Sequence, residues 1–317
     1  MLNDVRRNQS YANALESVSA RIPTDALSVC LSDFSLLPVI AAKICKDPVL
    51  ALEQTDIGQR GLINLAKHND APVQVLLKDN FDPDEELAGK KIGLLAAEPF
   101  LRTSDLPWFD LNFWYFRSKL DHHLHESCQI LPRTGCLYLA AVHFDDLWKI
   151  RAPVAEVEGF DVSLMDDLIA SALEVKEVHE AEPHPLWEYP NALLTRPVKA
   201  LTFSFNERVP EKPMVGSGRV QLAESLVDSG IRHCHAVVLW MEYNLDGKAI
   251  VSTGLKDRAQ TDLLRPAWSM HHKQAVFFLR QAVDLRDLFE KQKTVFLNYH
   301  VEFRTCNGEM RLRFDLA

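Results

Sequence analysis

The sequence predicts an α/β domain with a parallel sheet, followed by an antiparallel β-barrel or sandwich with one helical insert. Up to residue 131, apolar runs of strand length alternate with amphipathic runs of helix length, which is typical of a parallel α/β sheet. From Pro132 onward, alternating or aromatic-rich runs follow one another between Gly, Asp and Pro, which favours antiparallel strands. We therefore expect one domain over residues 1–131 and a second over residues 132–317.

In the first domain the periodicity of apolar residues predicts four helices and four strands. Tyr11, Ala14, Leu15 and Val18 lie on one face of the first helix. The helices are expected over 5–20, 36–45, 57–69 and 111–124, and the strands over 26–32, 48–53, 73–79 and 91–99.

The second domain is predicted to contain eight strands, one helix over 160–175 and an ordered proline-rich loop over 182–190. The expected strands are 136–144, 198–205, 218–225, 235–245, 249–255, 274–279, 293–303 and 310–316.

The composition is that of a globular protein, with 317 residues of which 47% are hydrophobic and 25% charged. A net charge of -9 argues against nucleic-acid binding, which depends on Lys and Arg contacts to phosphate. No apolar run is long enough to span a membrane or to act as a signal peptide, so we expect no membrane partner. The cysteines form no CxxC pair, which favours a reduced intracellular protein without a cysteine-rich zinc site: Cys30, Cys45, Cys128, Cys136, Cys234 and Cys306.

The turn between the first strand and the second helix contains no glycine. It lies in VCLSDFSLLPVIAA, residues 29–42, and reads Ser-Asp-Phe-Ser. Cofactor-binding turns at this place use glycines, because the backbone must come close to the ligand and often takes a positive φ. The strand–helix frame of such a turn is therefore present without the residues that admit a cofactor.

Several segments resemble the protein arginine methyltransferase family. AAEPFLRTSDLPW (96–108) resembles the loop after strand four, which carries two glutamates in that family. WSMHHKQAVFFL (268–279) resembles its Thr-His-Trp loop, and EGFDVSLMDDL (158–168) resembles the start of its dimerisation arm. LWKIRAPVAEVEGFD, EAEPHPLWEYP and LWMEYNLDGKAIVSTGL are similar to the C-terminal half of a two-module member.

The resemblance implies a Rossmann-like, S-adenosylmethionine-type domain, then an antiparallel β-barrel with a helical dimerisation arm over about 158–178. It places the three cofactor glycines of the family at Leu31, Asp33 and Ser35, where none is glycine. Asp33 would also bring a carboxylate near the carboxylate of the cofactor's methionine part. Glu53 matches the acid that accepts hydrogen bonds from the ribose hydroxyls, as a vestigial cofactor residue; a solvated acid at a strand end is the alternative.

For methyl transfer the resemblance implies two carboxylates that orient the substrate guanidinium, which stays protonated at neutral pH. Glu98 matches the first, but the second position is Pro107; Asp105 nearby is short and out of register. His271 matches the histidine of the barrel loop, and His272 replaces its tryptophan. Glu98 and His271 are thus candidate catalytic residues of a vestigial kind, and a structural histidine is the alternative for His271.

The arm is expected to dock on another module, because it carries more apolar residues than a lone helix can bury. These residues are Phe160, Val162, Leu164, Met165, Leu168 and Ile169. The expected partner is an upstream catalytic module or a second subunit.

The resulting hypothesis is a catalytically degenerate module of an enzyme that methylates arginine in proteins such as histones. S-adenosylmethionine is expected to serve the whole protein and not to bind this module. A cytoplasmic and nuclear location is expected. Two alternatives stay open: an active arginine methyltransferase that uses Glu53, Glu98 and His271, or a binding module whose acidic loops hold Arg-rich peptides without chemistry.

Two histidine-rich segments raise a metal site as an alternative. His122 and His125 would share a face if the helix over 111–124 continued, and a solvated helix end is the other interpretation. In RHCHA (232–236), strand alternation places His233 and His235 on one face and Cys234 on the other. We expect no metal at either place.

Overall fold

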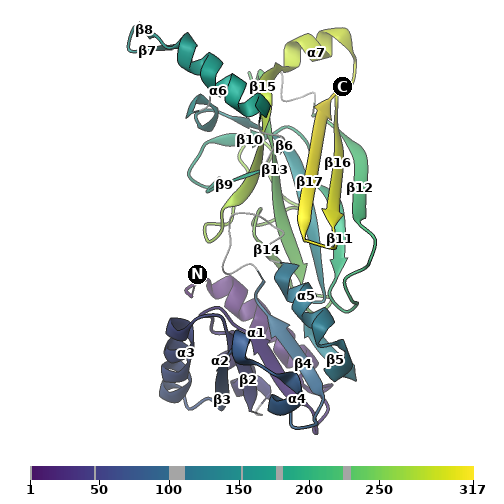
Figure 1. Ribbon diagram of the computed structural model, residues 1–317. Coiled ribbons are helices and arrows are strands. Elements are labelled where there is room, and N and C mark those ends of the chain that lie inside the picture. Colours follow the sequence, from purple (N-terminus) through teal and green to yellow (C-terminus); the bar gives the residue numbers. More distant parts are fainter. Residues whose placement is uncertain (1, 46–47, 100–110, 151–152, 176–180, 224–229) are drawn as a thin grey trace.

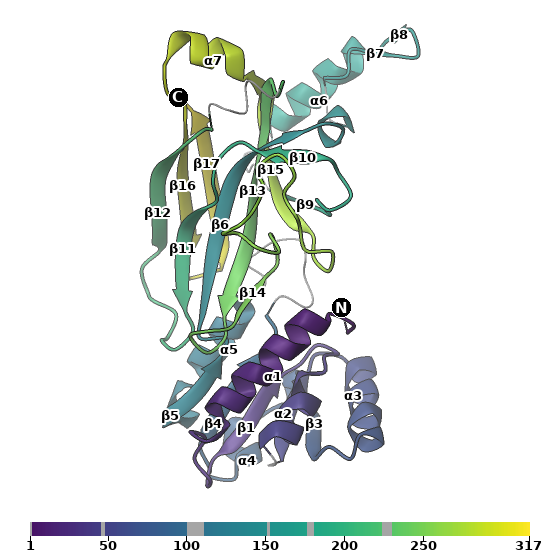
Figure 2. The same ribbon diagram turned by 180° about the vertical axis from the view of Figure 1, so that it is seen from behind.

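The chain folds into an α/β half and a β-rich half (Figures 1 and 2). The largest of its clusters of buried apolar residues runs through both halves. The structure, a computed structural model, describes residues 2–45, 48–99, 111–150, 153–175, 181–223 and 230–317. Within these residues no helix has the length and apolar content needed to cross a membrane.

The α/β half is built on a five-stranded sheet whose strands all pair in parallel. In spatial order the strands are β3 (Val73–Leu77), β2 (Val49–Glu53), β1 (Leu27–Leu31), β4 (Ile92–Ala97) and β5 (Leu124–Leu131). The helices are α1 (Val5–Ser19), α2 (Leu37–Cys45), α3 (Asp56–His68), α4 (Pro83–Glu86) and α5 (Asn112–Lys119), with short 3₁₀ helices at Lys78–Asn80 and Asp121–His123. The central strands β2 and β4 are buried on both faces, which explains their continuous apolar sequences. The predicted fold class of this half is confirmed.

Helix α1 packs along α2 with the predicted apolar face buried. Tyr11 is fully buried, and its hydroxyl donates to the Ala97 carbonyl at the end of β4 over 2.7 Å. Asp4 caps the helix by accepting from the Arg7 backbone N–H. Arg7 lies one turn before Tyr11 and is also buried.

The prediction of a helix over 111–124 is wrong for the second half of that range. Helix α5 ends at Lys119, and the chain then forms β5, a fifth parallel strand that pairs with β4. The sequence concealed this strand because β5 is a sheet edge with polar residues in its middle, and only Ile130 and Leu131 at its end are buried. His122 therefore lies in a 3₁₀ turn and His125 in a strand, so the shared helical face does not exist.

The β-rich half contains a seven-stranded and a three-stranded antiparallel sheet, which together form the predicted barrel-like region. The larger sheet consists of β10 (Asn191–Leu193), β6 (Thr134–Phe144), β13 (His233–Asn244), β15 (Gln274–Asp284) and β9 (Glu182–His184), with β11 (Val198–Ser204) on β6 and β14 (Ile250–Ser252) on β13. The smaller sheet consists of β12 (Met214–Gln221), β16 (Phe296–Arg304) and β17 (Glu309–Leu316). A 3₁₀ helix (Leu147–Ile150) and helix α7 (Leu285–Lys291) lie between strands. Strand β9 falls where a loop was predicted; its Pro183 is tolerated because β9 is an edge strand paired only with β15.

A close backbone approach brings the two antiparallel sheets together at β11 and β12. A Cβ atom on Gly216 in β12 would lie only 1.9 Å from the carbonyl oxygen of Ala200 in β11. Glycine is therefore required at this position, because any side chain would push the two strands apart.

Helix α5 joins the two halves through aromatic side chains. Trp114 is buried, packs edge-on against Phe203 and Phe205, and stacks on Phe303. Its indole N–H donates to the Glu207 carbonyl over 2.7 Å. Through Trp114, helix α5 of the α/β half therefore packs against β11, the segment that follows it, and β16 of the β-rich half.

The helical insert projects from the end of the β-rich half that is far from the α/β half (Figure 1). It begins with a two-stranded hairpin, β7 (Glu156–Val157) and β8 (Phe160–Asp161), and continues as α6 (Ser163–Val175). The helix starts later than predicted because Glu158 and Gly159 take positive φ angles and form the hairpin turn. Among the described residues of the arm, the exposed large apolar side chains include Phe160, Leu164, Met165, Leu168 and Ile169.

A stack of histidines and one tryptophan covers the end of β6 and β13. The centre of the His235 ring lies 4.7 Å from that of His143 and 4.9 Å from that of Trp148. The His233 ring is also stacked with His235, at 5.8 Å. His235 accepts the Phe144 backbone N–H at Nδ1 over 3.0 Å. Burial, together with the other two histidines, lowers the pKa of His235 to about 3.

We predict that Gly216→Ala destabilises the protein by about 1–3 kcal/mol, because the added Cβ meets the backbone of β11. Urea unfolding measures this effect. Val215→Ala is the matched control: Val215 is the next residue of β12, is 56% exposed, and its truncation should change stability by less than about 0.5 kcal/mol. Equal effects of the two substitutions would contradict the close approach.

We also predict that neutral His235 makes stability fall on acidification. The folded pKa is about 3 and the unfolded one about 6.5, so the unfolded state takes up the proton first as the pH drops below 6.5. The contribution is fully present above pH 6.5, and about 2 kcal/mol of it is lost between pH 7 and pH 5. His235→Asn keeps an acceptor for Phe144 and should remove this part of the loss in urea titrations at the two pH values. The same substitution at exposed His122 is the control and should leave the loss unchanged.

Candidate functional site

The turn after β1 closes on itself and on the neighbouring strand. Phe34 takes a φ of 57°, a conformation that is rare for a bulky residue and costs about 1 kcal/mol or more. Its backbone N–H donates to both carboxylate oxygens of Glu53, over 3.1 and 3.2 Å. Its half-exposed ring lies over Gly61 of α3, where a Cβ would come within 2.3 Å of the ring. The turn thus has a defined shape without any glycine of its own.

Glu53, the last residue of β2, is completely buried. Beside the Phe34 N–H, one of its oxygens lies 2.5 Å from where a Cβ on Gly58 would be, so the start of α3 closes that side. Burial raises the pKa of the Glu53 carboxyl and negative Asp33 adds to this, while hydrogen bonds from Ser32 and Phe34 oppose the rise. Its carboxylate is occupied by donors of the chain itself.

Glu98, which follows β4, forms a buried ion pair with Arg7 of α1. The Arg7 Nε lies 2.9 Å from the Glu98 Oε1, and both side chains are almost fully buried. Burial raises the pKa of Glu98, and the Arg7 guanidinium and the Ser35 hydroxyl oppose the rise. The resemblance assigns the Glu98 carboxylate to a substrate arginine, but in the structure it contacts an arginine of its own chain.

Sequence reasoning missed Arg7. A signal was present, because Arg7 continues the buried stripe of α1 formed by Tyr11, Ala14 and Val18 at helical spacing. A charged residue on a buried face requires a partner, so it points to a buried acid.

The two histidines of the barrel loop differ in environment. His271 is exposed, and its Nε2 lies 3.9 Å from the Asp4 carboxylate at the start of α1. His272 is buried, with its Nδ1 3.1 Å from the Ser269 hydroxyl, and burial and then Arg7 lower its pKa to about 4. His271, which the resemblance matches to the family's histidine, is therefore the more exposed of the two rings and faces Asp4 at the start of α1.

The predicted residues gather at two neighbouring places around the turn. Glu98 pairs with Arg7 and His271 faces Asp4, both at the start of α1. Glu53 instead contacts the Phe34 N–H and lies beside Gly58 of α3. A cavity of about 450 Å³ lies between the start of α1 and the β-rich half. Its lining residues include Asp4, Arg7, Glu242, Arg258 and His271. Asp105 and Pro107, the residues considered for the second carboxylate position, lie outside the described residues.

The two histidine-rich segments do not assemble a metal site in the described part of the chain, where no group of three or more His, Cys, Asp or Glu side chains could hold a metal ion. His233 and His235 do share one face of β13, as alternation predicted, and Cys234 lies in the apolar core on the other.

Comparisons with known proteins agree with this architecture. Residues 133–315, more than half of the chain, match the family described as the arginine methyltransferase oligomerization subdomain. The chain is 39% identical over 319 residues to protein arginine N-methyltransferase 7 of Cricetulus longicaudatus and 38% identical over 317 residues to that of Xenopus laevis. It covers 44% and 45% of these relatives, so it spans about half their length.

Solved structures show the same fold at lower identity. The Trypanosoma brucei PRMT1 enzyme–prozyme heterotetrameric complex with AdoHcy matches with a TM-score of 0.66 at 13% identity, over 100% of this chain and 92% of that one. Arabidopsis thaliana protein arginine methyltransferase 10 in a uniquely open conformation matches with a TM-score of 0.59 at 14% identity, over 100% of this chain and 95% of that one. The sequence match and the fold together place this chain in the protein arginine methyltransferase family.

Proposed function

We propose that this chain is the C-terminal module of a protein arginine methyltransferase and that it acts as a scaffold rather than as a catalyst. The whole protein would use S-adenosylmethionine to methylate arginine in Arg-rich proteins such as histones. We place it in the cytoplasm and nucleus; none of the six cysteines forms a disulfide, as is usual in a reducing compartment. Each curated relative is about twice as long as this chain, which supports a second, catalytic module within the same protein.

The bond between the Phe34 N–H and Glu53 carries the proposal. A cofactor ribose needs the carboxylate that this N–H occupies, and Glu53 exposes no surface to receive it. To bind, the ribose would have to break both hydrogen bonds and move a turn whose ring is seated on α3. The residues of this turn therefore do not fit S-adenosylmethionine.

The replaced glycines add to the misfit. Ser35 is buried and its hydroxyl accepts the Leu37 N–H, so its side chain fills space at the start of α2. Asp33 adds a negative charge to the same turn, which disfavours a cofactor carboxylate. An active enzyme in its own right, one of the two alternatives, would need all of these contacts to rearrange.

The arm supports a partner role. Leu168 is 64% exposed and Leu164 is 74% exposed, and such a patch on a projecting helix favours docking to another surface. The Trypanosoma complex joins an enzyme and a prozyme in one assembly. By analogy, this chain would pair with the upstream catalytic module, or with a second subunit when that module is absent.

We predict that isothermal titration of S-adenosylmethionine into the purified chain gives no saturable heat, because Glu53 and the turn are closed by their own hydrogen bonds. Circular dichroism on the same sample verifies folding. Ser35→Gly, which restores one glycine of the family pattern, should give neither binding nor methyl transfer to a histone peptide. Micromolar binding by the natural chain, or robust turnover by this single variant, would overturn the proposal.

We predict that the isolated chain self-associates through its arm. Sedimentation velocity should show a concentration-dependent rise in mass that Leu168→Glu abolishes, since a carboxylate in an apolar contact is costly. Ala170→Glu adds the same charge on another side of α6, near buried Asp166, and should leave association intact. A strictly monomeric natural chain, or equal loss in both variants, would refute docking through this face.

A further inference from the structure

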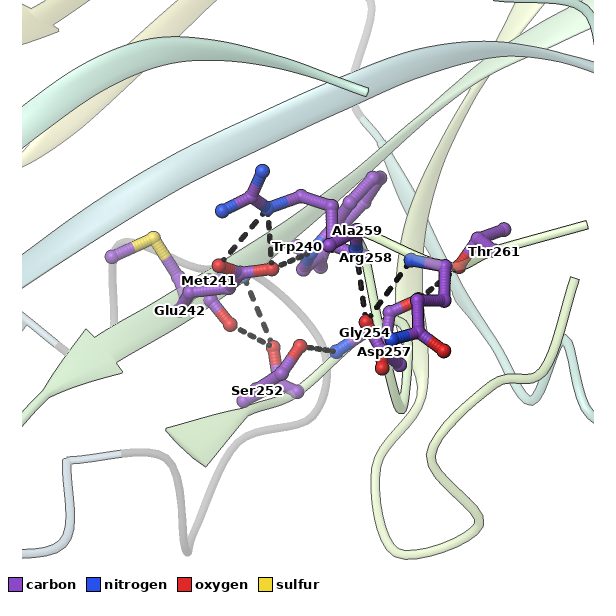
Figure 3. Close-up of polar contacts among 11 residues, drawn as sticks. Trp240, Met241, Glu242, Ser252, Gly254, Asp257, Arg258, Ala259 and Thr261 are labelled. Carbon is purple, nitrogen blue, oxygen red and sulfur yellow. Dashed lines mark hydrogen bonds and ion pairs between the residues drawn. The ribbon is translucent and has the colours of Figure 1, made fainter. Parts of the chain in front are cut away.

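A buried carboxylate of the β-rich half is bonded to an arginine from a neighbouring loop (Figure 3). The side chain of Glu242, in β13, is only 8% exposed. The Arg258 Nε lies 3.0 and 3.2 Å from its two oxygens, and the Trp240 indole N–H donates to one of them over 3.4 Å. Glu242 lies in one of the segments that resemble the family, but the resemblance assigned no role to it.

An aromatic wall completes the surroundings of this arginine. The Arg258 guanidinium lies 4.2 Å from the centre of the Tyr138 ring, which is stacked on Trp240 at 5.9 Å. Trp240 is held in place from behind, because a Cβ on Gly254 would lie 2.1 Å from its ring. Tyr138 and Trp240 therefore form a stacked and packed pair beside the Arg258 guanidinium.

A buried carboxylate beside an aromatic face favours a guanidinium over an ammonium ion. The planar guanidinium can donate to both oxygens while it stacks on the ring, whereas an ammonium ion is a compact and strongly hydrated point charge. We propose that Glu242, Tyr138 and Trp240 form a guanidinium site for an arginine side chain of another protein or peptide, and that Arg258 occupies this site until such a ligand displaces it.

The guanidinium site can be reached from outside. The Arg258 side chain is 35% exposed, and both it and Glu242 line the 450 Å³ cavity that faces the start of α1. A ligand that enters this cavity therefore meets the pair without crossing the apolar core.

The loop that carries Arg258 is held by bonds that do not involve the Arg258 side chain. The Asp257 carboxylate accepts the Ala259 and Gln260 N–H groups over 3.0 and 3.1 Å, and the Asp257 carbonyl accepts the Thr261 hydroxyl. The arginine can thus leave while the loop keeps its shape, and a truncated side chain is compatible with the fold.

The test is binding of fluorescein-labelled Gly-Gly-Arg-Gly-Gly to the full chain, followed by fluorescence anisotropy. Arg258→Ala should bind this peptide at least about tenfold more tightly than the natural chain, because the buried carboxylate then lacks its internal partner. The same peptide with Lys in place of Arg should bind Arg258→Ala little more tightly than it binds the natural chain. Adding Glu242→Gln to Arg258→Ala should cancel the gain in affinity for the arginine peptide.

Arg265→Ala is the matched control, since Arg265 is an exposed arginine of the same loop and its loss changes the net charge equally. No gain in Arg258→Ala, or the same gain in Arg265→Ala or with the lysine peptide, would overturn the site. A thermal melt gives a second measurement: methylguanidinium should raise the Tm of Arg258→Ala and not that of the double variant. No rise, or an equal rise in both, would count against the site.

The guanidinium site goes beyond the scaffold role and does not depend on it. Cofactor binding by the natural chain would overturn the scaffold role and leave these results untouched, while an absent arginine gain would overturn only the site.

Discussion

Burying a carboxylate is costly unless a donor is supplied, and this requirement organises the functional region of the molecule. Among the buried acids of the described residues, Glu53 and Glu98 lie at the ends of strands and Glu242 faces the cavity. Each is satisfied from within the chain, by the Phe34 N–H, by Arg7 and by Arg258 respectively. These internal contacts support the proposed scaffold role of the turn after β1 and of the residues around it.

The three pairs also connect parts of the fold that are distant in sequence. Glu53 fixes the turn after β1 to the end of β2, and Glu98 fixes α1 to the end of β4. Beyond them, Trp114 of α5 joins the α/β half to the β-rich half through aromatic contacts. Several exposed apolar side chains gather on the projecting arm instead, which supports the proposed docking role.

The regular elements with a buried face could be predicted from the sequence, because burial imposes a period on the apolar residues. Helix α1 and the central strands β1, β2 and β4 lie where the pattern placed them. Two of the strands that the pattern missed, β5 and β9, are edge strands with few buried side chains. At an edge, pairing to one neighbour suffices to form a strand, so polar residues and even a proline are tolerated and the apolar signal is lost.

The sequence by itself determined that an α/β half precedes a β-rich half and that the turn after β1 contains no glycine. It also determined that Glu53, Glu98 and His271 stand at positions that match functional residues of the family. These are properties of local spacing and residue type. Only the tertiary structure decided which donor each buried acid receives, since Arg7 lies 91 residues before Glu98 and Phe34 lies 19 residues before Glu53. Hydrogen bonding and charge pairing act through space in a low-dielectric interior, and the fold alone brings these groups to distances of 2.9 to 3.2 Å.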